Sequence, residues 1–131
     1  MNDTAGIARN RLLIVDDQRL FGELISNVAQ MAGFATEIAV QVDEFLNKVE
    51  TFQPTVMTID LLMPGADGIE LLRTLAARNC QAQILVISGF DERMLRTAQV
   101  LGHELGLKMS GTITKPIRAA DLRRTFEALK V

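Results

Sequence analysis

The sequence predicts an α/β domain in which a parallel sheet of five strands is covered by helices on both faces. Short continuous apolar runs alternate five times with longer segments whose apolar residues recur every three or four positions. The continuous runs are typical of strands that are buried on both faces, and the longer segments are typical of amphipathic helices. This alternation favours a doubly wound sheet with right-handed crossovers.

The five predicted strands are short apolar runs that end at polar residues or turn signals. The runs at residues 12–15 and 84–87 are the clearest, because every residue in them is apolar. Pro54 marks the break before the third run, and the second run has the weakest pattern. We expect strands at residues 12–15, 34–40, 55–59 and 84–87, and a short last strand around Ile113.

The five predicted helices are segments with apolar residues at helical spacing. We expect them at residues 18–32, 42–49, 69–78 and 94–105, and from residue 119 to the end. In the first helix the apolar positions are Leu20, Phe21, Leu24, Ile25, Val28 and Met31, and Gly33 ends the helix.

Two smaller expectations concern the core and a helix cap. Met31, Met57 and Met94 are interpreted as core residues, since methionine fills irregular apolar gaps. Ser88 is followed three residues later by Asp91, which fits a capping box. Ser88 is therefore a candidate N-cap of the fourth helix as well as a candidate site residue.

Length and composition favour one soluble domain. We expect residues 1–9 to form a flexible tail and residues 10–131 to form the domain. The 14 basic and 16 acidic residues give a formal charge of −2, so nothing favours direct binding of nucleic acid. No apolar run approaches the roughly 20 residues that span a membrane. Cys80 is the only cysteine, which excludes an intramolecular disulfide and makes the cytoplasm the simplest expected location.

Polar side chains stand at the ends of four of the five predicted strands. Asp16 and Asp17 follow the first strand, Asp60 the third, Ser88 the fourth and Lys115 the fifth. The carboxyl ends of parallel strands lie at one edge of the sheet, and ligands bind there at the topological switch point. If the strand order is 2-1-3-4-5, the first and third strands are neighbours and their acids converge.

The chemistry of these residues favours phosphoryl transfer onto an aspartate. Three carboxylates that lie together repel one another, and a divalent cation relieves that repulsion. Oxygen ligands without histidine or cysteine favour Mg²⁺ over zinc. Lys115 suits a phosphoryl oxygen, Ser88 can donate a hydrogen bond, and a carboxylate such as Asp60 can itself be the nucleophile that forms an aspartyl phosphate.

Four segments resemble the receiver domain of two-component response regulators. They are LLIVDD at 12–17, IDLLMPGADGIELL at 59–72, ILVISG at 84–89 and TKP at 114–116. Each segment alone is a weak signal, but together and in this order they extend the resemblance over about residues 10–131. The resemblance implies a flavodoxin-like (βα)5 fold with strand order 2-1-3-4-5.

The resemblance also implies how the acidic residues work. Asp60 would accept a phosphoryl group from a histidine kinase or a phosphotransfer protein. Asp17, Asp60 and the backbone carbonyl of Leu62 would bind Mg²⁺ directly, and Asp16 would contribute through water. Such a protein is a signalling switch and not an enzyme with a separate substrate.

The remaining implied roles concern the phosphoryl group and the response to it. Ser88 would donate a hydrogen bond to the phosphoryl group and shift on activation, Lys115 would pair with that group, and Pro116 resembles the cis-proline of the family. Activation would change the face made by the fourth helix, the fifth strand and the fifth helix. A homodimer or another partner would bind that face, and an output domain would lie outside this chain.

Three features depart from the usual receiver pattern. Thr112 occupies the switch position on the fifth strand where an aromatic residue is usual, so the readout must differ. The long segment at 88–115 resembles receivers fused to EAL-type cyclic-di-GMP phosphodiesterases. Leu62 and Phe90 are apolar at positions that border the path of the hydrolytic water, so we expect slow loss of the phosphoryl group.

Two other functions stay open at this point. The chain could be a receiver-like interaction module that works without phosphate, which the lack of an aromatic residue at Thr112 allows. A phosphatase of the haloacid dehalogenase class also uses an aspartate nucleophile at a strand end. That class needs a second acid two residues later as acid and base, and Leu62 stands there instead.

Overall fold

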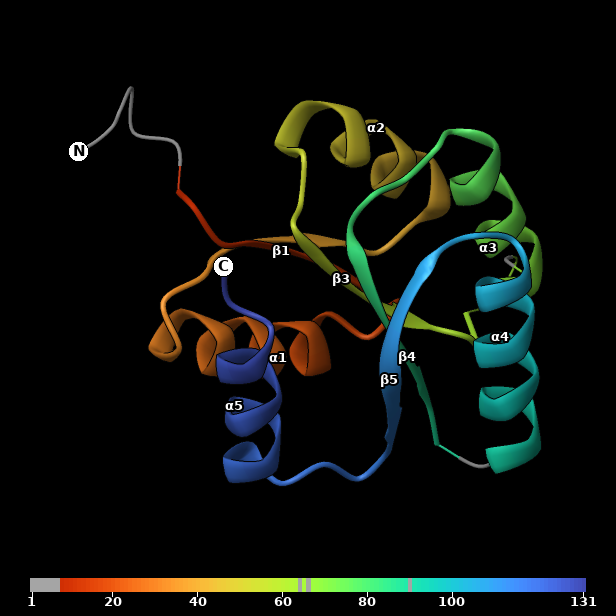
Figure 1. Cartoon of the computed structure of the whole chain (residues 1–131). Helices are drawn as coiled ribbons and strands as arrows, with labels where there is room; N and C mark the ends of the chain where they lie inside the picture. Colours follow the sequence, from red (N-terminus) through yellow and green to blue (C-terminus); the bar gives the residue numbers. More distant parts are fainter. Residues whose placement is uncertain (1–7, 64, 66, 90) are drawn as a thin grey trace.

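The computed structural model describes residues 8–63, 65, 67–89 and 91–131, so residues 1–7 of the predicted tail lie outside it (Figure 1). Strands and helices alternate along the chain as predicted. The strands are β1 (Arg11–Val15), β2 (Ala35–Ala39), β3 (Val56–Asp60), β4 (Gln83–Ser88) and β5 (Lys108–Thr114). The helices are α1 (Arg19–Met31), α2 (Val42–Phe52), α3 (Gly68–Ala77), α4 (Glu92–Glu104) and α5 (Ala119–Ala128).

The five strands form one parallel sheet in the order β2-β1-β3-β4-β5, which confirms the predicted topology. Helices α1 and α5 cover one face, and α2, α3 and α4 cover the other (Figure 1). β1 and β3 are neighbours, and the strand order runs outward from them in opposite directions, to β2 on one side and to β4 and β5 on the other. This is the position where the carboxyl edge of such a sheet opens to a ligand.

Each face of the sheet carries its own core, which explains why the central strands are apolar throughout. In β1, Leu13 and Val15 pack toward α2, α3 and α4, whereas Leu12 and Ile14 pack toward α1 and α5. Successive side chains of a strand point to opposite faces, so a strand that is covered twice has no exposed position left for polar residues.

Helix α1 does not bury all of the apolar residues expected to pack inward. Leu20, Leu24 and Met31 are 83 %, 44 % and 62 % exposed, so the prediction of Met31 as a core residue is wrong. The helix instead contacts the sheet through a strip that contains Gly22 and Ser26. A Cβ atom on Gly22 would lie 3.1 Å from Ile38, so this small residue allows the helix to lie close to β2. The other two methionines pack as predicted: Met57 is buried and Met94 is partly buried against the core.

The last strand is longer than predicted. β5 has seven residues, and its pairing with β4 shifts because Ile84 pairs with Met109 whereas Leu85 pairs with Gly111. Ser110 is therefore an extra residue in a β-bulge. The sequence pattern indicated only the part around Ile113, because an edge strand with a bulge buries few side chains and tolerates polar residues and glycine.

Helix α4 is capped by Asp91 and not by Ser88. The Asp91 carboxylate accepts a hydrogen bond from the backbone N–H of Met94, 3.1 Å away. Ser88 is the last residue of β4, and its carbonyl accepts a hydrogen bond from the backbone N–H of Lys115. The prediction of Ser88 as an N-cap is thus wrong, because the strand continues to Ser88 and the helix begins only at Glu92.

Within the described ranges, every helix is too short or too polar to cross a lipid bilayer.

Candidate functional site

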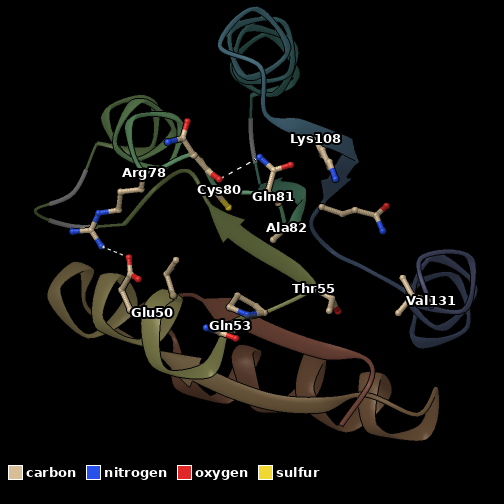
Figure 2. Close-up of a pocket in the computed structure, with 13 residues that line it drawn as sticks. Glu50, Gln53, Thr55, Arg78, Cys80, Gln81, Ala82, Lys108 and Val131 are labelled. Atoms are coloured by element: carbon tan, nitrogen blue, oxygen red, sulfur yellow. Dashed lines mark hydrogen bonds and ion pairs between the residues drawn. The ribbon is translucent and has the colours of Figure 1, made fainter. Parts of the chain in front are cut away.

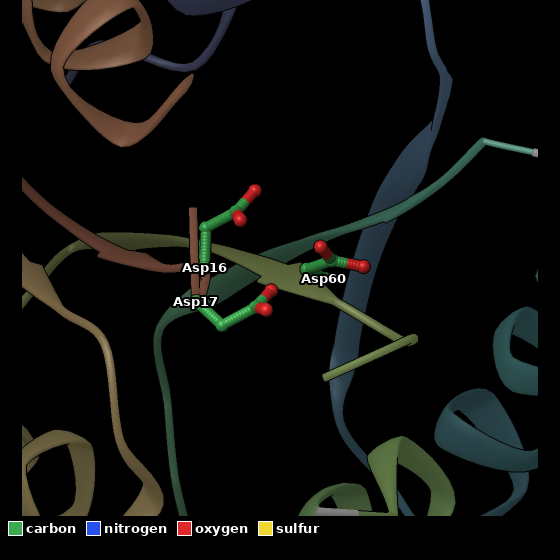
Figure 3. Close-up of side chains that lie close together, drawn as sticks. All are labelled: Asp16, Asp17 and Asp60. Atoms are coloured by element: carbon green, nitrogen blue, oxygen red, sulfur yellow. The ribbon is translucent and has the colours of Figure 1, made fainter. Parts of the chain in front are cut away.

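The strand ends bring three carboxylates together at the carboxyl edge of the sheet. One side-chain oxygen from each of Asp16, Asp17 and Asp60 lies within 4.8 Å of the others (Figure 3). Asp16 and Asp17 follow β1 directly, and Asp60 is the last residue of β3. The side chains of Asp16 and Asp60 are 1 % and 5 % exposed, whereas Asp17 is exposed to solvent. The convergence predicted from the strand order is therefore confirmed for these three residues.

Lys115 joins this cluster from the end of β5. Its Nζ lies 3.2 Å from Asp60 Oδ2 and 3.4 Å from Asp16 Oδ2. Burial raises the pKa of Asp16, and the nearby charge of Asp60 acts in the same direction. The backbone N–H of Gln18 and the Lys115 ammonium oppose this increase in pKa. A single ammonium between two buried acids leaves the cluster with excess negative charge.

Backbone donors fix the orientation of the two buried carboxylates. The N–H of Gln18 donates to Asp16 Oδ1 at 2.8 Å, and the N–H of Leu62 donates to Asp60 Oδ1 at 2.9 Å. In both residues the Oδ2 atom then faces Lys115. Such side-chain to backbone bonds two residues along the chain are common where Asp begins a turn.

A cavity of about 670 Å³ opens over this cluster. Four residues expected at the site line it, namely Asp17, Asp60, Leu62 and Lys115. Pro116, which the resemblance indicated, also lines it, as do three residues that were not among the expected site residues, namely Gln18, Phe21 and Gly89. The Lys115–Pro116 peptide bond is cis, as the resemblance implied. Leu62 is 50 % exposed, and Phe90 lies outside the described residues.

Ser88 and Thr112 differ in how they relate to this cavity. Ser88 is fully buried at the end of β4, and its Oγ has no hydrogen-bond partner within the part of the chain that the structure describes. A buried hydroxyl without a hydrogen bond lowers the stability of the fold, which is consistent with a group that hydrogen-bonds to a ligand when one is bound. Thr112 is exposed on β5 and lines a separate hollow between β5 and α5. The structure therefore does not bring Thr112 to the cavity.

Close packing of Gly68 against Leu61 supports the end of β3, where Asp60 lies. A Cβ atom on Gly68 would lie 2.8 Å from Leu61 Cδ2 and 3.0 Å from Leu61 Cα. The backbone of Leu61 follows Asp60 directly and cannot move without displacing that carboxylate. The glycine at the start of α3 therefore fixes the distance between the helix and the strand end.

We expect Gly68→Ala to lower the free energy of unfolding by about 1–3 kcal/mol, the usual cost of overpacking. Urea denaturation followed by circular dichroism measures this change. Gly89→Ala is the matched control, because its Cβ would meet Lys115 Cβ only at 3.8 Å, an ordinary contact. Equal stability of Gly68→Ala and the parent protein would show that the helix can move away freely.

A second cavity, of about 600 Å³, lies at the opposite edge of the sheet and lacks the chemistry of the first (Figure 2). Its acid Glu50 lies 3.5 Å from Arg78 in an ion pair. Burial raises the pKa of the Cys80 thiol at its wall, which disfavours the reactive thiolate. The acid cluster therefore marks the better candidate site.

The donor set at the acid cluster fits a hard divalent cation. The three clustered side chains are all carboxylates, and the described residues that line the cavity include no histidine or cysteine. Mg²⁺ prefers such oxygen ligands and commonly combines one or two carboxylates with phosphate oxygens.

Comparisons with known proteins point in the same direction. The family profile of the response regulator receiver domain matches residues 12–127. The alkaline phosphatase synthesis transcriptional regulatory protein PhoP of Bacillus subtilis is 29 % identical over 119 residues, which are 91 % of this chain and 48 % of PhoP. The positive alginate biosynthesis regulatory protein of Pseudomonas aeruginosa is 30 % identical over 91 % of this chain and 45 % of its own length. The chain thus spans about half the length of the curated relatives it matches.

A solved structure agrees over nearly its whole length. The response regulator signal receiver domain from Bermanella marisrubri superposes with a TM-score of 0.80 at 31 % identity. The match covers 91 % of this chain and 96 % of that one.

Proposed function

Because this chain belongs to the response regulator receiver domain family, which serves phosphorylation-based two-component signalling, we propose that it is a switch that accepts a phosphoryl group on Asp60. One observation carries this proposal above the others. Asp60 lines the cavity beside two further acids, and its Oδ2 atom lies 3.2 Å from Lys115 Nζ. A carboxylate in this position can attack a phosphorus atom that enters the cavity.

The proposed step is an in-line transfer from a phosphohistidine of a histidine kinase or phosphotransfer protein. An Asp60 carboxylate oxygen forms the new O–P bond while the P–N bond of the donor breaks. The electron pair of that bond stays on the imidazole, which takes up a proton from solvent. Lys115 balances negative charge on the transferred oxygens, and the Ser88 hydroxyl donates a hydrogen bond to one of them.

Asp17, Asp60 and the carbonyl of Leu62 would hold Mg²⁺ directly, with Asp16 contributing through water. When bound, the ion would supply positive charge beside the phosphoryl oxygens. The excess negative charge of the cluster supports this assignment, since Lys115 alone contacts both buried acids among the described cations.

The output of the switch is proposed to lie on the face of α4, β5 and α5. On α4, Val100 is 61 % exposed and lines a shallow apolar hollow with Arg96 and Leu101. This face is suited to a homodimer or a partner, and residues 10–131 would act on an output domain outside this chain.

Two predictions from the resemblance stay predictions. The readout differs from the usual one because Thr112 lacks an aromatic ring, and the chain is related to EAL-linked receivers. We place the protein in the cytoplasm, without direct contact to nucleic acid or membrane.

The alternative functions are less well supported by the site. A haloacid dehalogenase-type phosphatase would need an acid in the place of Leu62, which is apolar and half-exposed. The protein would therefore turn over no separate substrate. A phosphate-independent interaction module would not need Asp17, Asp60, Ser88 and Lys115 gathered at one edge.

Intact-mass spectrometry after incubation with a small phosphodonor tests the function. We expect the gain of one phosphoryl group in the presence of Mg²⁺ and none in Asp60→Asn. Asp67→Asn is the matched control, because Asp67 is an exposed acid that caps α3. An equal gain in Asp60→Asn would assign the phosphoryl group to another residue. No gain in the parent protein, even with a phosphorylated histidine donor, would favour the phosphate-independent module.

We expect the phosphoryl group to be lost slowly, and Leu62→Asn to accelerate its loss about fivefold to tenfold. An amide can hold the attacking water through a hydrogen bond worth about 1 kcal/mol, which an apolar side chain cannot do. The decay of the phosphorylated mass after removal of the donor measures the rate. Leu20→Asn is the control, since Leu20 is exposed and does not line the cavity. A half-life of seconds in the parent would contradict shielding by Leu62.

A further inference from the structure

We propose that Phe21 is a positioning residue that holds the Lys115 ammonium beside Asp60 through a cation–π contact. The inference rests on the proposed phosphoryl transfer and adds a residue to it. The Lys115 Nζ lies 4.2 Å from the centroid of the Phe21 ring. That distance is well within the range in which the negative face of an aromatic ring attracts a cation.

The Phe21 ring is held in place by the core. Phe21 is half-buried on α1 and packs against the core between the sheet and α1 and α5, which includes Ile25 and Phe126. Phe21 also lines the cavity together with Lys115 and Gln18. The lysine side chain has more rotatable bonds than the phenylalanine side chain. A contact with a ring that is anchored in the core can therefore restrict the lysine to fewer conformations.

The Phe21 ring can keep its contact with Lys115 during the reaction, which the acids cannot do. Lys115 contacts Asp16 and Asp60, the same carboxylates that a divalent cation and the incoming phosphoryl group would engage. Each of these contacts therefore weakens during the proposed reaction. The Phe21 ring neither binds a hard cation nor accepts a phosphoryl group, so it remains a partner of the ammonium from the resting state to the phosphorylated state.

The ring also limits the access of water to the ammonium. The Lys115 side chain is 21 % exposed although it stands at the wall of an open cavity. A cation–π contact gains strength when it is shielded from solvent. The position next to the acceptor thus favours a contact that is worth more than one on the protein surface.

Two kinds of substitution test the contact and its role. Phe21→Leu keeps an apolar side chain but removes the ring, and mono-, di- and trifluorinated phenylalanine at position 21 keep the shape while they weaken the negative face stepwise. We expect Phe21→Leu to slow phosphorylation by a small phosphodonor roughly threefold to tenfold. We expect the fluorinated series to slow it progressively, and Phe21→Tyr to retain most of the rate.

The matched control is Phe52→Leu, which removes a partly buried ring from the other core at the far end of α2. This variant should be phosphorylated at the same rate as the parent protein. A second readout does not depend on phosphorylation, because an aromatic ring shifts the NMR signals of protons over its face upfield. The ε-methylene protons of Lys115 should show that shift in the parent and lose it in Phe21→Leu.

The outcomes separate this inference from the proposed function. A parent protein that gains no phosphoryl group would remove the proposed function and the positioning role together. A parent that is phosphorylated at a rate which neither Phe21→Leu nor fluorination changes would overturn the positioning role alone. The absence of an upfield shift on Lys115 would overturn the contact itself, whatever the rates.

Discussion

Replacing Lys115 by alanine is expected to slow phosphorylation of Asp60 roughly 10²-fold. The substitution removes an ammonium that lies 3.2 Å from the acceptor oxygen. Removal of one well-placed group that stabilises developing negative charge commonly costs about 10²–10³ in rate. Initial rates from intact-mass spectrometry, with equal concentrations of phosphodonor and Mg²⁺, measure the effect.

The same substitution is expected to lower the free energy of unfolding in the absence of Mg²⁺ by about 3 kcal/mol. Removing one partner of a buried ion pair typically costs 3–5 kcal/mol, because it leaves an uncompensated charge. Here two acids would be left, Asp16 and Asp60, which are 1 % and 5 % exposed. The partial exposure of Lys115 places the expected loss near the lower end of that range. Addition of Mg²⁺ should restore part of the stability, which urea denaturation with and without the ion would show.

Lys48 offers a close control for this prediction, because it also lies between two carboxylates. Its Nζ is 3.1 Å from Glu37 and 3.4 Å from Glu44. Those acids are 42 % and 35 % exposed, so solvent screens the pairs and Lys48→Ala should cost at most about 1 kcal/mol. Equal effects of Lys48→Ala and Lys115→Ala on stability would mean that burial does not decide the strength of these pairs.

The sequence alone predicted the sheet and the acid cluster for the same reason. Strands buried on both faces must be apolar, so polar residues become informative at the places where the strands end. The sequence therefore places Asp16, Asp60 and Lys115 at one edge of the sheet. The strand order alone brings these ends together, and no side-chain detail is needed.

The features that sequence patterns missed depend on how the elements pack against each other. The spacing of apolar residues in α1 does not tell which of two adjacent strips faces the sheet, and Gly22 decides this by allowing close approach to Ile38. With α1 in this orientation, Phe21 on the helix and Gln18 directly before it line the cavity. Gly89 reaches the same cavity directly after β4 ends, where the chain turns toward α4.

A second large effect concerns the binding of a divalent cation to the acid cluster of the folded protein. Mg²⁺ should raise the melting temperature, because it binds the folded state, in which Asp16, Asp17 and Asp60 converge, better than the unfolded chain. At about 100 times the dissociation constant the stabilisation is about 2.7 kcal/mol. For a domain of this size that corresponds to a shift of roughly 10 °C. Differential scanning fluorimetry or calorimetry with increasing Mg²⁺ measures it.

Asp17→Asn separates metal binding from the structural role of the acids. Asp17 is exposed, so its replacement leaves the core intact and removes one negative charge from beside Asp16 and Asp60. The metal-free variant should therefore melt at or above the temperature of the parent, and most of the shift caused by Mg²⁺ should disappear. Asp43→Asn, which changes an exposed acid in the first turn of α2, should keep the full shift. If Mg²⁺ raised the melting temperature of Asp17→Asn as much as that of the parent, the ion would bind elsewhere. A site made of three converging carboxylates loses affinity for the cation when one of the charges is removed.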